Sequence, residues 1–565
     1  MTRGRPPQED RVLVPPRGDR GDPWLAVAFA VSLILIGLVV LPQLWLLRAS
    51  LVATDGSITL ANFTRFFSGA RYLAALRNSV VLSLLICAIA MAIAVPLAFV
   101  HARYRLPGKG AILTLAAMAT VTPPFLGAYV WIMLLGWSGF LSSALRAIGI
   151  PFDSIVGFSG IVWVGSWSAV GLVFMFAYDA FSTMDPSLEE AAMSVGATRR
   201  RAYLQVSLPM ATPALLTVGY LVLMAAFTDF GTPRIIGGDV EVLPVLVYNA
   251  FLGEVSTQPS MASTASLVMV AISTLVLMAQ RYLLTRRSYA LSGTARARPR
   301  ELSPIGTVVV MAWTGLVFLL VFTPHLVVTG LSFFSWTMDV PHLPITLANY
   351  EALGRRSLSP VLVSYLLAIV STLAAVLVGV LVAYIVVRKA FLVMGPGLNA
   401  LVMLPYLIPG TVLAVGLIVA FSRPPLALTG TGAILAIAYF IRKLPYSMKA
   451  AEAALYQVHP SLEEAALSVG ATPARAFRDV TVRLILPALA SGATVTFLAT
   501  ITELSATIML YSAAWTTMTV VIFQAAQGMG GVFGVASATA VVMMVSIYVP
   551  LYLVRRHYRV GAVLA

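Results

Sequence analysis

Long apolar stretches alternate with short polar segments along almost the whole chain. A helix needs about 20 predominantly apolar residues to cross the hydrocarbon core of a bilayer. The pattern predicts twelve such spans: Trp24–Leu47, Ser79–Val100, Ala111–Leu135, Gly160–Ser182, Pro213–Ile236, Thr264–Leu284, Pro304–Gly330, Val361–Val387, Leu398–Phe421, Gly432–Tyr446, Ala488–Leu510 and Phe533–Val554. The apolar runs therefore predict an all-α integral membrane protein with about 12 transmembrane helices.

The composition supports a membrane protein over a soluble one. Hydrophobic residues make up 59% of the 565 residues and charged residues only 10%, whereas soluble domains carry about a quarter charged residues. Such a chain has too few polar side chains to cover a water-exposed surface. The single cysteine, Cys87, lies inside a predicted span, so no intramolecular disulfide is possible.

Lysine and arginine are distributed unevenly between the two sides of the predicted membrane. With a cytoplasmic N-terminus, the cytoplasmic segments carry 28 of the 37 basic residues, including Arg442 and Lys443 in a loop expected at 442–483. Because basic residues are enriched in cytoplasmic loops, we expect a multi-pass protein of the bacterial-type cytoplasmic (inner) membrane with both termini cytoplasmic. This bias and anchoring to membrane lipid account for the net charge of +15, so no nucleic-acid partner is expected.

The sequence contains an internal repeat. Residues 187–215 and 461–489 share 17 identities in 29 positions when they are aligned without gaps. Two units with six spans each point the same way through the membrane, as in a parallel repeat. We expect a tail at 1–23, a first unit at 24–284, a basic cytoplasmic linker at 285–303 and a second unit at 304–565.

The repeated phrase "SLEEAAMSVGAT" has the pattern of two short helices joined at a glycine. Ser187 and Glu190 have the spacing of a capping box, which predicts a helix start. Gly196 suits the left-handed position just past a helix end, and Thr198 can cap the next helix. In the second copy the equivalent threonine precedes Pro473, a preferred first helical residue. We expect one helix–glycine–helix loop on the cytoplasmic side of each unit.

These loops resemble the cytoplasmic signature of the permease subunits of binding-protein-dependent ABC importers. That signature is Glu-Ala-Ala, three residues, Gly, nine residues and Ile-x-Leu-Pro; the first copy matches it with Val206 in place of isoleucine, and the second has Val480–Arg483 at the Leu-Pro ending. In that family the first helix inserts into a groove of a separate ATPase. The resemblance implies an ATPase-coupling role for Glu189, Glu190, Ala191, Ala192, Gly196, Glu463, Glu464, Ala465, Ala466 and Gly470.

The resemblance also implies the partners. They are two ABC ATPase subunits and a periplasmic or other extracytoplasmic solute-binding protein. The sequence has no G-x-x-x-x-G-K-[ST] phosphate loop, so ATP hydrolysis is expected in the partner subunits. We therefore expect a transporter subunit with no enzyme activity, no catalytic residue, no metal site and no cofactor of its own, the ATP and magnesium being bound by the partner ATPase.

Two carboxylates fall inside predicted spans at equivalent positions. In the register of the repeat, Asp229 in "TDFGT" aligns with Glu503 in "TELSA". An ionisable residue inside a span is a functional-site hypothesis by default; the alternative is a carboxylate that lies at the outer interface or caps a broken helix. The candidates for the translocation pathway are Asp229, Glu503, Thr228 and Thr502, with Arg234 as a residue that neutralises Asp229.

Four prolines in the third and ninth predicted spans have two interpretations. Pro123, Pro124, Pro405 and Pro409 would break helices and free backbone carbonyls where the backbone lines a cavity, or they would only kink packed helices.

Among permeases, the fused two-unit layout with "TDFGTP" and "ITELSATIMLY" most resembles the ferric-iron type. The implied solute is ferric iron, with an organophosphate (a phosphonate or sugar phosphate), thiamine or a polyamine as alternatives under the same mechanism. A secondary transporter is the alternative class, since it also has twelve spans in two halves. It would have no reason to repeat a capped loop for an ATPase.

Overall fold

The structure, a computed structural model, describes residues 22–52, 56–185, 187–252, 259–286, 300–337, 340–389, 391–528 and 533–558. The described chain is almost entirely helical. The linker predicted at 285–303 lies largely outside the described residues, as does the tail up to residue 21.

The first half runs to Arg286. Its helices are α1 (Pro23–Leu35), η1 (Ile36–Val40), α2 (Leu41–Leu51), α3 (Ala61–Ser68), α4 (Ala70–Arg103), α5 (Lys109–Ala119), α6 (Pro124–Leu135), α7 (Phe140–Ala147), α8 (Phe158–Thr183), α9 (Ser187–Ser194), α10 (Arg199–Ala202), η2 (Tyr203–Ser207), α11 (Leu208–Phe227), α12 (Gly231–Ile236), α13 (Leu243–Leu252) and α14 (Pro259–Arg286).

The second half begins at α15 and includes a short hairpin. Its elements are α15 (Pro304–Leu331), β1 (Phe334–Thr337), β2 (Val340–Ile345), α16 (Ala348–Arg356), α17 (Leu358–Tyr384), η3 (Ile385–Lys389), α18 (Met394–Leu407), α19 (Gly410–Phe421), α20 (Gly432–Gln457), α21 (Ser461–Ser468), α22 (Pro473–Ala476), η4 (Phe477–Val482), α23 (Arg483–Ile501), α24 (Thr507–Leu510), η5 (Ala513–Trp515), α25 (Met518–Ala526) and α26 (Phe533–Tyr558). Strands β1 and β2 pair antiparallel.

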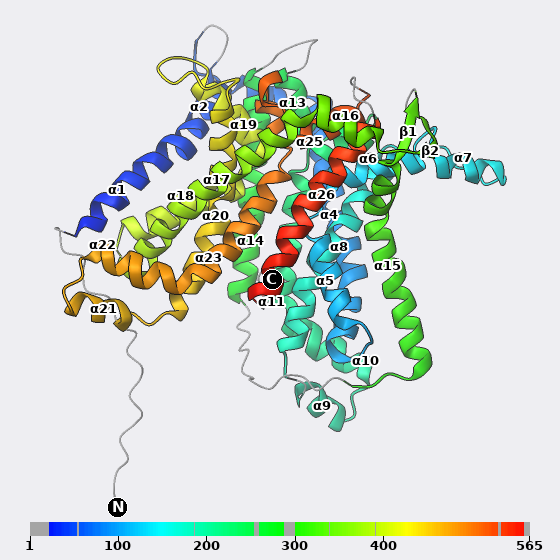
Figure 1. Ribbon diagram of the computed structural model, residues 1–565, viewed down its shortest axis with the longest axis horizontal. Coiled ribbons are helices and arrows are strands. Elements are labelled where there is room, and N and C mark those ends of the chain that lie inside the picture. The colour runs from blue at the N-terminus through cyan, green and yellow to red at the C-terminus, as the bar shows by residue number, and fades with distance from the viewer. Residues whose placement is uncertain are drawn as a thin grey trace, which may run out of the picture.

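The predicted repeat is visible in the order of the helices. In the register that aligns the two repeated phrases, the starts of α8, α9, α10 and α14 coincide with the starts of α20, α21, α22 and α26, respectively. Figure 1 shows α9 and α21 at the same face of the molecule, which we call the coupling face, and α13 and α25 at the opposite, outer face. The two halves therefore run in the same direction, as predicted for a parallel repeat.

The described residues contain ten helical stretches long and apolar enough to cross a membrane, and the α18–α19 pair, bent by 110°, makes an eleventh. The span predicted at Gly432–Tyr446 is the first part of α20, which continues to Gln457. Arg442 and Lys443 therefore lie inside a helix, and their assignment to a cytoplasmic loop is wrong. The apolar pattern missed this because α20 carries charged residues within its length.

Four predicted spans are interrupted by irregular backbone. The third is split into α5 and α6 around Thr120–Pro123, and the ninth into α18 and α19 before Gly410. The regular helices of the fifth and eleventh end at Phe227 and Ile501. At the third and ninth spans the proline lacks an amide hydrogen and the helix restarts immediately after it. Pro123 and Pro409 therefore stand at the breaks, Pro124 is the first residue of α6, and Pro405 lies inside α18, which continues to Leu407.

The two halves are interleaved. Helices α1 and α2 of the first half pack against α18 and α19 of the second, while α15 of the second half packs against α5, α6 and α8 of the first. Close helix approach occurs within each half as well: a Cβ at Gly379 of α17 would lie 2.9 Å from the amide nitrogen of Met448 on α20. Small residues at such crossings let membrane helices approach closely.

Candidate functional site: two coupling loops and a central cavity

The first coupling loop has the predicted helix–glycine–helix form. Helix α9 ends before Gly196, whose φ of +94° is the left-handed conformation that favours glycine. The Thr198 hydroxyl then accepts a hydrogen bond from the Arg201 amide at 3.3 Å and caps α10. This part of the sequence prediction is confirmed.

The second loop repeats this geometry. Helix α21 ends before Gly470, with φ +89°, and Thr472 caps α22, in which Pro473 is the first helical residue. Both loops continue through a π-helical turn, η2 or η4, into the next span. The Val480–Arg483 departure from the family signature therefore leaves the course of the second loop unchanged.

The predicted capping boxes are wrong in detail. At the first loop, the Ser187 amide donates to the Asp185 carboxylate at 2.9 Å, and this bond lowers the pKa of Asp185. In the second loop Ser461 contacts the ring of His459 at 2.8 Å, and α21 has no side-chain cap. The S-x-x-E spacing predicts that the serine oxygen caps the helix. Instead, a side chain two residues before it, Asp185 or His459, accepts a hydrogen bond from the serine amide at the helix start.

The two adjacent glutamates of the first loop have different environments. Glu189 is 5% exposed; its carboxylate lies 2.8 Å from the buried Arg103 guanidinium, accepts a hydrogen bond from Ser207 at 2.6 Å, and lies 3.7 Å from Arg300. Glu190 is exposed and lies 3.3 Å from Arg300. Glu189 therefore joins α9 to α4 and to the span that follows.

The second loop is anchored by the equivalent glutamate with different partners. Glu463 accepts hydrogen bonds from the Tyr384 hydroxyl and, at 3.0 Å, from Thr481. Thr481 is the counterpart of Ser207 in the repeat, so both halves share this hydroxyl contact. No cation pairs with Glu463 among the described residues. The first loop is thus held by ion pairs and the second by hydroxyl groups.

Each coupling loop leaves an apolar surface uncovered. Leu188 and Val195 are exposed in the first loop, and their counterparts Leu462 and Val469 are exposed in the second. Val195 and Val469 are 86% and 87% exposed. The small residues Ala191 and Ala465 are also exposed beside them. Matched apolar surfaces at one face mark interaction sites.

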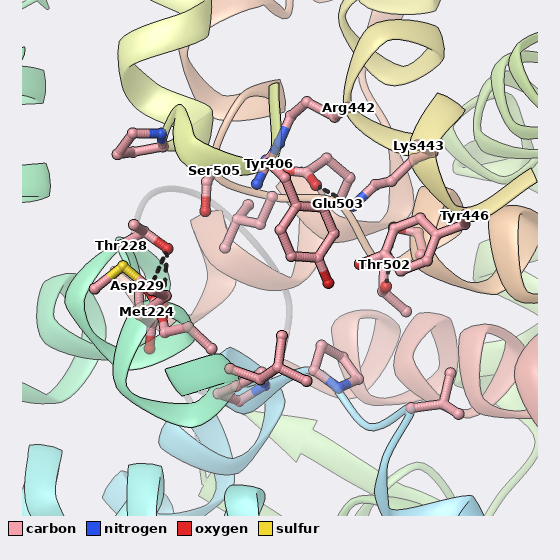
Figure 2. Close-up of a pocket in the computed structure, with 18 of the residues that line it drawn as sticks. Met224, Thr228, Asp229, Tyr406, Arg442, Lys443, Tyr446, Thr502, Glu503 and Ser505 are labelled. Carbon is pink, nitrogen blue, oxygen red and sulfur yellow. Dashed lines mark hydrogen bonds and ion pairs between the residues drawn. The ribbon is translucent and has the colours of Figure 1, made fainter. Parts of the chain in front are cut away.

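A cavity of about 620 Å³ lies between the halves (Figure 2). Its walls combine the broken third and ninth spans with the ends of α11 and α23. It is lined by Thr120, Val121, Thr122, Pro123, Pro124, Phe125, Leu172, Phe176, Leu221, Met224, Ala225, Thr228, Asp229, Gly231, Ser273, Pro405, Tyr406, Leu407, Ile408, Pro409, Arg442, Lys443, Tyr446, Val495, Leu498, Ala499, Thr502, Glu503, Leu504 and Ser505. All four predicted pathway candidates and all four prolines are among these residues.

Glu503 is neutralised by two cations. Its carboxylate contacts the Arg442 guanidinium and lies 2.8 Å from the Lys443 ammonium. It also accepts a hydrogen bond from the Ala506 amide at 3.2 Å, just past the end of α23. The predicted alternatives therefore coexist, since this residue both lines the cavity and caps a broken helix.

Asp229 occupies the equivalent place in the first half without a cation. Its carboxylate accepts a hydrogen bond from the Thr232 amide at 3.3 Å, and Thr232 is the counterpart of Ala506 in the repeat. Among the described residues no ion pair to Asp229 exists. Arg234 is exposed and absent from the cavity wall, so the prediction that it neutralises Asp229 is wrong.

Thr228 and Thr502 precede the two carboxylates. Each hydroxyl donates to the backbone four residues earlier, Thr228 to Met224 at 2.9 Å and Thr502 to Leu498 at 3.0 Å. Each threonine thus adds a side-chain hydrogen bond to a carbonyl in the last turn of its helix, where the regular backbone pattern ends. The broken ends of α11 and α23 are built alike.

Sequence reasoning did not place most of the lining residues at the cavity, among them the polar side chains of Tyr406, Arg442, Lys443 and Tyr446. The charges of Arg442 and Lys443 in an apolar stretch were a usable signal, but the positive-inside pattern assigned them to a loop. Within the part of the chain described here, no group of three or more His, Cys, Asp or Glu side chains has the geometry to hold a metal ion.

Comparison with known proteins gives one family. The model of the "binding-protein-dependent transport system inner membrane component" family matches residues 90–289 and 375–559. The ferric transport system permease protein FbpB of Actinobacillus pleuropneumoniae is 31% identical over 443 residues, which cover 75% of this chain and 62% of that relative. The match thus spans less than two thirds of that relative's length.

Two further similarities are more limited. The putative 2-aminoethylphosphonate transport system permease protein PhnV of Salmonella paratyphi A is 31% identical over 158 residues, covering 28% of this chain and 59% of that relative. A solved structure of a bacterial ABC transporter involved in the import of the acidic polysaccharide alginate matches with a TM-score of 0.39 and 18% identity, over 47% of this chain and 96% of the other.

Proposed function

The chain belongs to the family of inner membrane components of binding-protein-dependent transport systems, and from this premise we propose that it supplies two fused permease units to an ABC importer. It receives a solute from an extracytoplasmic binding protein and passes it to the cytoplasm. Two separate ATPase subunits supply the energy. In this proposal the chain itself catalyses no reaction, and both of its termini are cytoplasmic.

The observation that carries this proposal is the pair of matched loops at the coupling face. Each loop offers an exposed helix with a leucine, a valine and a small alanine at equivalent positions. Each helix is fixed to the span behind it through a glutamate, Glu189 or Glu463. A partner that moves such a helix would therefore move the span. This favours one ATPase subunit per loop.

The cavity supports a route for the solute. It lies where the broken spans of both halves meet, and Gly231 of the first half is so close to Leu504 of the second that a Cβ there would lie 2.9 Å from it. Irregular backbone at membrane depth is tolerated where it lines a cavity. A relative movement of the halves at this contact would change the access to the cavity.

Ferric iron is the solute that we propose. Support comes from the ferric transport permease, whose similarity extends over 75% of this chain. The absence of a metal-holding side-chain cluster among the described residues favours selection of iron by the binding protein rather than by a coordination site here. An organophosphate is the second candidate because the relative named for 2-aminoethylphosphonate transport matches at the same identity over a shorter region.

Glu464→Lys tests the coupling role. Glu464 is exposed on α21 and has no ion-pair partner among the described residues, so a lysine there changes the docking surface without breaking an internal contact. We expect co-purification of the ATPase and ATP-driven uptake into proteoliposomes to fall by about tenfold or more. The matched control is Glu351→Lys, an exposed glutamate on α16 at the outer face. Wild-type uptake by the Glu464 variant would contradict the proposal.

The same proteoliposomes identify the solute. Uptake is measured with the binding protein loaded with ferric ion or with 2-aminoethylphosphonate. Stimulation by ferric ion supports the iron proposal, and stimulation by the phosphonate alone replaces it while leaving the importer mechanism intact. ATP-independent uptake driven by an ion gradient would instead favour a secondary transporter.

A further inference from the structure

The charges around the cavity are divided between its two walls. Figure 2 shows Asp229 on one side and Arg442, Lys443 and Glu503 on the other, with Tyr406 between them. Two cations against one carboxylate leave an excess of one positive charge on the wall of the second half. Asp229 places a carboxyl group on the wall of the first half, and no cation among the described residues pairs with it there.

This division is a difference between the two halves of the repeat. Ser168 and Ala169 are the first-half counterparts of Arg442 and Lys443, so the first half has small neutral side chains where the second has both cations. The carboxylates themselves are retained at equivalent positions, each with its amide hydrogen bond. The two halves therefore share the carboxylate positions but differ in charge, because only the second half has cations at these two positions.

Other features hold the positive wall in place. A Cβ at Gly410 would lie 2.2 Å from the Arg442 guanidinium nitrogen, so glycine at the start of α19 leaves the space in which this group lies. Lys443 is 8% exposed and Glu503 is 7% exposed, which limits the movement of both. Charges fixed in a poorly solvated wall act on a ligand more strongly than charges in water.

On this basis we propose that the cavity accepts a solute whose positive and negative groups are held apart, with the positive group toward Asp229 and the negative group toward Arg442 and Lys443. The inference rests on the proposed transport function and narrows its solute class. A solute with only positive charges meets the excess cation of one wall, and a solute with only negative charges meets Asp229. Two sources satisfy the proposal: an organic zwitterion, and a ferric ion whose anionic ligand keeps an uncoordinated negative group on the side away from the metal.

Binding to the purified full-length chain in lipid nanodiscs tests this without the partners. Four probes are titrated calorimetrically: 2-aminoethylphosphonate and ferric citrate, which both carry separated charges, 1,4-diaminobutane, which is only cationic, and methylphosphonate, which is only anionic. We expect one of the first two to bind about tenfold or more tighter than both single-sign probes. Whether the phosphonate or the iron complex binds distinguishes the two sources.

Single substitutions test which wall of the cavity binds the positive group of the solute and which wall binds the negative group. Asp229→Asn should weaken binding of the charge-separated probe by about tenfold and strengthen that of methylphosphonate, while Arg442→Gln should weaken both. Asp239→Asn is the control, since Asp239 is exposed and absent from the cavity wall.

Three results would overturn the inference: tightest binding of 1,4-diaminobutane or methylphosphonate, no measurable binding of either charge-separated probe, or unchanged affinity in Asp229→Asn. None of them affects the proposed importer function, because ATPase docking and ATP-driven uptake are measured separately through Glu464→Lys. Conversely, wild-type uptake by the Glu464→Lys variant together with the expected probe preference would contradict the coupling role and leave this inference intact.

Discussion

Adjacent glutamates in the coupling loops have separate structural roles. Glu189 is buried against Arg103, which is itself 4% exposed, whereas Glu190 is exposed and pairs with Arg300. A buried ion pair that loses one partner leaves an uncompensated charge, but an exposed pair contributes little. The sequence motif alone does not distinguish these roles, because both residues are glutamate.

Glu189→Gln should destabilise the protein far more than Glu190→Gln. Removal of the buried carboxylate leaves Arg103 unpaired, at a cost of about 3 to 5 kcal/mol, whereas the exposed pair is worth less than about 1 kcal/mol. Thermal unfolding in detergent, followed by tryptophan fluorescence, compares the two variants. Equal midpoints would show that Glu189 does not hold Arg103.

Glu463→Gln gives an internal comparison. Its partners are the Tyr384 and Thr481 hydroxyls, and an amide oxygen can still accept from a hydroxyl. The cost should therefore be about 1 to 2 kcal/mol, less than for Glu189→Gln. A larger loss of the unfolding midpoint in Glu463→Gln than in Glu189→Gln would contradict the assignment of ion pairs to one loop and hydroxyls to the other.

Gly410→Ala should displace Arg442 from Glu503. The added methyl group meets the Arg442 guanidinium and would also lie 2.9 Å from the Cβ of Ser505, so the flexible guanidinium moves away and the backbone near Ser505 shifts slightly. The matched control is Gly397→Ala in α18, where a Cβ meets nothing within 4 Å and a helical alanine stabilises by up to about 1 kcal/mol. We expect the unfolding midpoint to fall in Gly410→Ala and to stay or rise in Gly397→Ala; the reverse order would exclude close packing at Gly410.

At the level of elements, the segment that precedes α15 lies against the first coupling loop. The Arg300 amide donates to the Arg103 carbonyl at 2.9 Å, and its own carbonyl accepts from the Arg105 amide at 2.8 Å. Its side chain reaches both glutamates of α9. The start of the second half thus holds the coupling helix of the first, and the described residues include no such segment against α21.

Arg300→Gln should loosen α9 and leave α21 unchanged. The variant removes the side-chain ion pairs but retains the backbone hydrogen bonds. Hydrogen–deuterium exchange of residues 187–196 should become several-fold faster, because local opening of a helix depends on the contacts that hold it. Residues 461–470 of the same chain are the control. Equal acceleration in both loops would indicate a global loss of stability instead.

Much of the element pattern could be predicted from the sequence. The register of the repeat predicted the matched loops, the glycine corners and the equivalent carboxylates, because each depends on local backbone chemistry. The breaks at Thr120–Pro123 and after Phe227 were each one of two interpretations left open, since an apolar run has the same hydropathy whether its helix is continuous or interrupted. The span predicted within α20 was too short because Arg442 and Lys443 are charged and were therefore assigned to a loop. Their pairing with Glu503, which is distant in the sequence, explains how they are accommodated inside a helix.

At the scale of the whole molecule, interleaving of the halves is the feature that tandem repetition alone did not predict. The first helix of each half packs on the other half, α1 and α2 on α18 and α19, and α15 on α5 and α6. In α19, a Cβ at Gly416 would lie 3.2 Å from both Leu46 and Pro42 of α2. The association between halves therefore depends on helix packing as well as on the covalent connection.

Cleavage of the connection should leave the halves associated. A protease site inserted between residues 290 and 297 interrupts none of the contacts described above, because it lies outside the described residues. After cleavage, an affinity tag on the first half should recover the second half in equal amount, since separation would expose α2, α15 and the cavity wall to detergent or lipid. As a control, Gly416→Leu places a large side chain against α2 and should reduce recovery after cleavage while the uncleaved chain stays intact. Separation of the cleaved wild-type halves in mild detergent would mean that the covalent connection, and not the interleaved helices, holds the two coupling loops at one face.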